Sequence, residues 1–152
     1  MKKFILGFIL TLAFILTSNA QKGTDYTNAI GLKLVNVGIG GVTFKHFFST
    51  QSAIELMALT STWSTIKGYT FTGYYEYHIP LADGFQFFLG GGAHLGFYSN
   101  NVTTYGIDGI LGIDYKFQQA PINLSLDWKP YWNLSHQTSG YNEIAIAARF
   151  AF

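Results

Sequence analysis

A polar segment near the C-terminal end carries the residue types that hydrolytic catalysis needs. It holds an imidazole at His136, a hydroxyl group at Ser139 and a carboxylate at Glu143. A hydroxyl becomes a good nucleophile when a neighbouring imidazole takes its proton and a third group orients that imidazole. The three residues are therefore candidates for catalysis, although a histidine in a polar loop is more often an ordinary loop residue.

Two other histidines, His78 and His94, stand among acidic residues and are candidates for metal binding. They fall on different predicted strands, and nothing in the sequence brings them together. We expect neutral, hydrogen-bonded histidines at these positions, with no metal and no cofactor. The chain has no cysteine, so a thiolate metal site and a disulfide are both excluded.

The first twenty residues have the pattern of an export signal. Lys2 and Lys3 precede an apolar run, and Ala20 is the small residue before Gln21. The apolar run is shorter than the roughly 20 residues that a spanning helix needs. We expect residues 1–20 to be a cleaved signal peptide and residues 21–152 to be one folded domain.

The composition limits the location of that domain. Only 11% of the residues are charged and 18% are aromatic, whereas about 25% are charged in ordinary soluble domains. Without Lys2 and Lys3, seven basic residues face eight acidic ones, so no excess of positive charge is available to bind nucleic acid. No segment after Gln21 is apolar enough for a spanning helix. A membrane location would therefore require a closed barrel.

Hydrophobic and polar residues alternate with period two, which is typical of strands. The pattern predicts eight strands, at residues 29–36, 42–48, 53–60, 69–79, 85–98, 104–117, 122–132 and 141–152. Short turns at 49–52, 80–84 and 118–121 alternate with connections at 37–41, 61–68, 99–103 and 133–140. This arrangement predicts an all-β, up-and-down meander that closes as an antiparallel eight-stranded transmembrane β-barrel.

One face of the predicted strands carries eleven of the fifteen charges that remain after signal removal. Buried charges are costly unless they pair with one another. We therefore expect an interior charge network rather than a water-filled channel. Its predicted members are Lys33, Lys45, Glu55, Glu76, Asp108, Asp114, Lys116, Asp127, Lys129, Glu143 and Arg149.

Alternation alone leaves open a soluble, lipocalin-like barrel with the apolar face inside. Three features favour the membrane arrangement. Several strands are long enough to cross a bilayer. Aromatic residues lie near both strand ends of the apolar face, and the loops carry almost no charge.

The chain resembles the small eight-stranded outer-membrane barrels of the OmpX and OmpA-transmembrane-domain kind. The signal peptide, the meander and the last strand, with Phe150 and the terminal Phe152, carry the resemblance. It implies an outer-membrane location, contact with lipid and lipopolysaccharide, and recognition of Phe150 and Phe152 by the barrel-assembly machinery. It implies no activity.

The most favoured function is structural or adhesive, at the cell surface. Two alternatives stay open. One is a narrow gated ion channel. The other is a lipid A-modifying enzyme, since some barrels of this size are deacylases with a His-x-Ser pair before a glutamate. The residue two positions after His136 is Thr138, which departs from that pattern.

Overall fold

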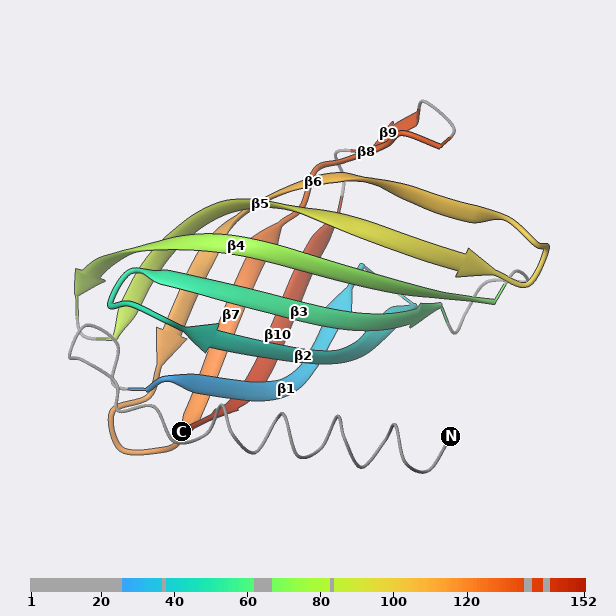
Figure 1. Cartoon of the computed structure of the whole chain (residues 1–152). Helices are drawn as coiled ribbons and strands as arrows, with labels where there is room; N and C mark the ends of the chain where they lie inside the picture. Colours follow the sequence, from blue (N-terminus) through green and yellow to red (C-terminus); the bar gives the residue numbers. More distant parts are fainter. Residues whose placement is uncertain (1–25, 37, 62–66, 83, 136–137, 141–142) are drawn as a thin grey trace.

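The computed structural model describes residues 26–36, 38–61, 67–82, 84–135, 138–140 and 143–152. Ten strand segments lie in these ranges (Figure 1). They are β1 (Asn28–Val35), β2 (Ile39–Phe47), β3 (Ser52–Ser61), β4 (Gly68–Ala82), β5 (Phe85–Tyr98), β6 (Thr103–Lys116), β7 (Ile122–Trp128), β8 (Tyr131–Asn133), β9 (Thr138–Gly140) and β10 (Ile144–Ala151). No helix long and apolar enough to cross a membrane occurs in the described part of the chain.

The strands form one closed antiparallel barrel of eight. Neighbours in the chain pair from β1 through β6, and β6 continues to β7. The barrel closes where β1 pairs with β10, for example Ile30 with Phe150. The backbone of each barrel strand thus hydrogen-bonds to a neighbouring strand on either side. The predicted fold class is confirmed.

The first six strands lie within three residues of their predicted bounds, but the last two predictions need correction. The predicted strand at 122–132 is interrupted at Lys129 and Pro130 and continues as β8. Proline has no N–H to donate to a ladder, yet its carbonyl still accepts from Gly109 N at 2.8 Å. β8 therefore keeps its pairing with β6, while its other neighbour becomes β9. β9 falls in a segment predicted as loop, and residues 141–142 of the predicted last strand lie outside the described residues.

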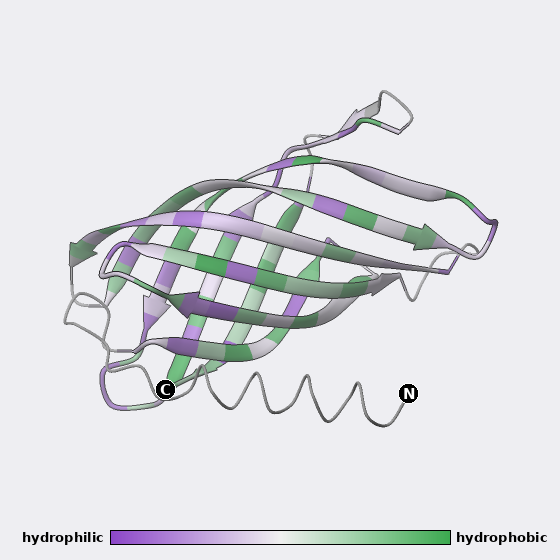
Figure 2. Ribbon diagram, in the orientation of Figure 1, coloured by the Kyte–Doolittle hydropathy of each residue, from purple (hydrophilic) through white to green (hydrophobic). Residues whose placement is uncertain are grey.

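Hydrophobic and hydrophilic residues alternate along the strands, as the colours of Figure 2 show, and side-chain exposure alternates with them. Along β10 the exposed residues Ile144, Ile146 and Phe150 alternate with buried Ala145, Ala147 and Arg149. β7 behaves in the same way. The apolar face is thus outside and the polar face inside, as expected for a barrel in lipid.

The barrel has two distinct ends. At one end, called here the turn end, the connections 48–51 and 117–121 lie on the same side as the C-terminus (Figure 1). At the other, called the loop end, are the end of β3, the connection 99–102 and the paired strands β8 and β9. Gly84 has a φ of 88°, a left-handed conformation that suits glycine, directly before β5.

Glycines on the inner face of β5 and β6 make room for large interior side chains. A Cβ on Gly112 would lie 2.7 Å from both Phe88 Cζ and Asp127 Cβ, and 2.5 Å from the Leu126 carbonyl oxygen. Phe88 is fully buried, so its ring has little space to move. The absence of a side chain at Gly112 is what allows Phe88 to fill the barrel.

Replacing Gly112 with alanine should lower the free energy of unfolding by about 1–3 kcal/mol, because the added methyl overpacks the interior. Urea unfolding of protein refolded into lipid vesicles would measure the loss. Gly91 is the matched control: its Cβ would meet nothing nearer than 3.6 Å. Equal losses at the two positions would contradict this account of Gly112.

Candidate functional site

The middle of the barrel is filled by paired charges. Lys33 Nζ lies 3.0 Å from Glu55 Oε2 and 3.0 Å from Asp127 Oδ2. Arg149 Nη2 makes a second ion pair with Glu55. All four side chains are between 0% and 2% exposed. Each charge thus faces a counter-charge inside the wall, which is the condition for burying it.

A second group lies nearer the turn end. Lys45 Nζ lies 2.8 Å from Glu76 Oε2 and 3.2 Å from Asp114 Oδ2, and 4.5 Å from the centre of the Phe88 ring. Buried His78 places Nε2 at 2.9 Å from Glu76 Oε2. The two groups are connected, since Asn123 donates to Asp114 and accepts from Arg149 Nη1 at 3.0 Å.

Nine of the eleven predicted network members form ion pairs with one another. Lys116 and Asp108 do not. Lys116 does not join the network: its Nζ donates to the carbonyl oxygens of Phe117 at 2.6 Å and Ala120 at 2.9 Å. Its place at the end of β6 lets the long side chain reach the carbonyls of the turn. Asp108 is inside the barrel, but its Oδ1 lies beside Nδ1 of His94 and not beside a lysine or arginine of the network.

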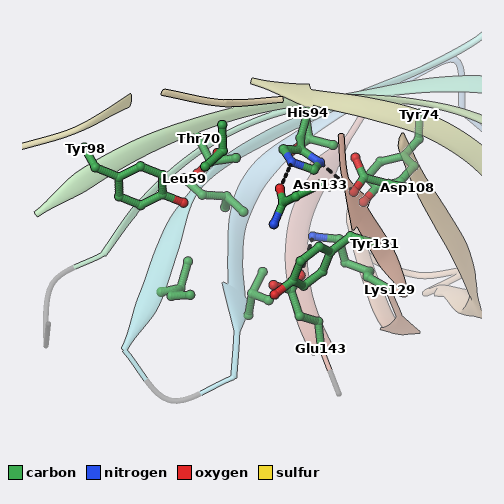
Figure 3. Close-up of a pocket in the computed structure, with 14 residues that line it drawn as sticks. Leu59, Thr70, Tyr74, His94, Tyr98, Asp108, Lys129, Tyr131, Asn133 and Glu143 are labelled. Atoms are coloured by element: carbon green, nitrogen blue, oxygen red, sulfur yellow. Dashed lines mark hydrogen bonds and ion pairs between the residues drawn. The ribbon is translucent and has the colours of Figure 1, made fainter. Parts of the chain in front are cut away.

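A polar cavity of about 120 Å³ lies toward the loop end of the barrel (Figure 3). His94 lines it, with Nδ1 2.8 Å from Asp108 Oδ1 and Nε2 2.7 Å from Asn133 Oδ1. Lys129 and Glu143 face the same cavity, with 3.8 Å between Lys129 Nζ and Glu143 Oε2. We call this polar cavity the base.

A second cavity of about 290 Å³ continues outward from the base. The two share Ile39, Leu59, Thr70 and Tyr98 in their walls, and Val102 lines the outer one. The base and this outer cavity together are called the vestibule. Val35, Leu59 and Tyr74, which line the base, belong to a buried apolar cluster that also contains Phe88. The vestibule therefore has a filled floor.

Glu143 lies between β9 and β10, outside the strands. Burial raises the pKa of its carboxyl above the usual value, and the nearby Lys129 ammonium opposes that rise. Lys129 is itself only 3% exposed and lies 5.7 Å from the centre of the Tyr74 ring. A positive group near Glu143 would favour its ionised form.

The described residues do not bring the predicted catalytic set together. His136 lies outside the described residues. Ser139 is exposed on β9 and pairs with Trp132, which is 55% exposed. Directly opposite residues of paired strands share a face, so Ser139 points away from the cavity that Glu143 lines. Among the described residues, no three histidine or acidic side chains gather in a way that would hold a metal ion.

Phe150 and Phe152, predicted as an assembly signal, lie at the turn end of the outer wall. They are 55% and 43% exposed, and their ring centres are 5.9 Å apart. His46 is half-buried, with Nδ1 2.8 Å from Asn28 Oδ1. These side chains are available to whatever surrounds the turn end of the barrel.

The architecture defines a class: a closed eight-stranded barrel with an apolar wall and a polar interior, as in small outer-membrane proteins. The N-terminal β-barrel domain of Pseudomonas aeruginosa OprF is similar, with a TM-score of 0.68 and 11% identity over 85% of this chain and 98% of that one. Neisserial surface protein A (NspA) is also similar, with a TM-score of 0.59 and 12% identity over 83% and 94% of the two chains. No protein-family model and no curated protein matches the chain. The resemblance seen in the sequence is confirmed as one of fold.

Proposed function

We propose that the protein is an outer-membrane barrel that does not conduct ions and has a structural or adhesive role at the cell surface. In this proposal residues 1–20 direct export and are removed. The turn end faces the periplasm and the loop end faces outward. The barrel-assembly machinery recognises Phe150 and Phe152, and the wall contacts lipid and lipopolysaccharide.

The outer wall supports the membrane location. Large apolar side chains such as Leu32, Leu126 and Ile146 are more than half exposed. Soluble monomers rarely expose contiguous apolar patches beyond about 300–600 Å². Aromatic residues are exposed toward both ends, with Phe85 and Phe117 at the turn end. Such girdles are usual where a barrel wall meets the two membrane interfaces.

The observation that carries the proposal is the filled interior. The charged groups of Lys33, Glu55 and Arg149 meet inside the barrel and are almost fully inaccessible to solvent. Ions need a continuous polar path with sites weak enough to leave. Paired, buried charges offer no such path, which favours a structural role over the channel alternative. Because the interior is filled, the polar interior side chains that a partner could reach lie at the loop end.

Planar-bilayer recording of the purified protein should show no ion conductance. A variant with both Glu55→Ala and Arg149→Ala should conduct, because the two substitutions remove the pair that crosses the barrel. Slower migration on a gel after boiling would verify that the variant is folded. The matched control is Ile146→Ala with Leu126→Ala, which removes bulk from the outer wall. Steady wild-type conductance would contradict an occluded interior and favour the channel alternative.

A further inference from the structure

The two parts of the vestibule differ in charge. The base is lined by the charged side chains of Asp108, Lys129 and Glu143, and the outer cavity by Leu59, Tyr98 and Val102 together with uncharged polar residues such as Thr60 and Asn100. Because the two cavities share walls, one molecule can occupy both. The base volume of about 120 Å³ far exceeds the roughly 10–15 Å³ that one water needs. A ligand that fits this shape has a polar head and a short apolar tail.

The base has unused capacity to accept hydrogen bonds. The Asp108 side chain is only 5% exposed. Its Oδ1 faces His94, while its Oδ2 is buried with no hydrogen-bond partner among the described residues. A buried acceptor left unpaired is costly, so such atoms usually have a partner. The carboxylate therefore needs a donor group that the described residues do not supply.

Glu143 is the second acceptor at the base. Its Oε2 lies 3.8 Å from Lys129 Nζ, which is too far for a hydrogen bond. Two carboxylates, Asp108 and Glu143, thus face the Lys129 ammonium and the His94 ring, which is positive only when protonated. With His94 neutral, a second positive group would balance the charge of the base, and a carboxylate or phosphate would add to the excess of negative charge.

Aromatic rings complete the surroundings. Tyr74, Tyr98 and Tyr131 all line the base, and the Tyr131 ring meets His94 edge-on at 6.1 Å between ring centres. The faces of tyrosine rings attract cations, most strongly where water is excluded. Carboxylates with tyrosine rings and an adjoining apolar cavity form a suitable environment for an organic ammonium group.

We propose that the vestibule binds a small amphipathic amine. Its ammonium group donates to Asp108 and Glu143, and its apolar part lies between Leu59, Tyr98 and Val102. The proposal requires only that the loop end is open to solvent. It is therefore independent of whether the barrel conducts, and it adds a ligand class to the proposed surface role.

The test uses butylammonium, with butyrate and butanol as matched probes of the same chain length. The full mature barrel, methyl-labelled and held in lipid nanodiscs, is titrated while the NMR signals of Ile39, Leu59 and Val102 are followed. Butylammonium should give saturable shifts at these methyl groups, whereas the outer-wall methyl of Ile146 should shift only with non-saturable partitioning into lipid. Butyrate should not saturate the vestibule signals.

The variants Asp108→Asn and Glu143→Gln should each weaken butylammonium binding by about fivefold to tenfold. The control variant Asp83→Asn, at a position between β4 and β5 in the sequence, should bind as the wild type does. Glu143→Gln tests the site independently if Asp108→Asn disturbs His94. Three results would each overturn the proposal. They are tighter binding of butyrate than of butylammonium, equal binding of butanol and butylammonium, and unchanged butylammonium affinity in both Asp108→Asn and Glu143→Gln. Wild-type conductance in the bilayer test would leave it standing.

Discussion

Replacing Arg149 with methionine should lower the free energy of unfolding by about 3–5 kcal/mol, the usual cost of breaking a buried ion pair by removing one partner. The Arg149 guanidinium contacts Glu55 and donates to Asn123 Oδ1 and Ser125 Oγ, each at 3.0 Å. Without it, the Glu55 carboxylate stays buried with Lys33 as its one remaining counter-charge. Urea unfolding in lipid vesicles would measure the loss.

A double variant separates the ion pair from the packing of Arg149. Adding Glu55→Gln to Arg149→Met removes the stranded negative charge, and Lys33 keeps Asp127 at 3.0 Å. The double variant should recover roughly 1–3 kcal/mol relative to the sum of the single losses. Lys116→Met makes the same kind of change outside the network, where Nζ meets turn carbonyls, and should cost about 0.5–1.5 kcal/mol. Equal losses at Arg149 and Lys116 would mean that the interior pairs do not stabilise the barrel.

Replacing Ile146 with arginine should destabilise the barrel by about 2–4 kcal/mol in lipid, since a charge then faces the middle of the bilayer. Ile146 is 55% exposed and stands between Leu34 on β1 and Leu126 on β7, both also exposed. The residues opposite Ile146 in both strand pairs are therefore apolar and offer no counter-charge. Unfolding in vesicles, with Ile146→Val as the conservative comparison, measures the effect.

Depth in the membrane supplies the control for Ile146. Ile122 is exposed on the same wall but begins β7 at the turn end. The cost of an arginine falls to about 0–1 kcal/mol near the interface, so Ile122→Arg should be nearly neutral. A barrel whose outer wall faced water would tolerate arginine at both positions, and a negligible loss at Ile146 would therefore rule out lipid contact there.

The sequence predicted the faces of the strands well because side-chain direction has period two along any strand. That rule put Lys33, Glu55 and Arg149 on one face and the apolar residues on the other without knowledge of strand register. The aromatic strand ends and the nearly uncharged loops then favoured the polar face as the inner one. The rule failed at Lys116, whose parity is inward but whose long side chain ends at the turn carbonyls. The alternation along a strand gives the direction of each Cβ. Where the charged end of a long, flexible side chain lies near a strand end is known only from the structure.

The vestibule was not predicted from the sequence. Parity placed His94 and Asp108 on the inner face, but their contact depends on the β5–β6 register, in which His94 pairs with Gly106 and Gly92 with Asp108. Asn133 reaches His94 because β8 still pairs with β6 beyond Pro130. A proline within a predicted strand was the available signal for an interruption. The sequence did not indicate that β8 would still pair with β6 after the interruption.

The pairing of β1 with β10 also has a consequence for how the barrel forms. Ile30 and Phe150 pair although 120 positions separate them in the chain, whereas the other strand pairs join segments close in sequence. Until β10 is in place, β1 and β7 each have an open edge, and every unpaired backbone group in lipid costs several kcal/mol. A partly closed barrel is therefore a poor intermediate, and insertion and closure are expected to occur as one cooperative step.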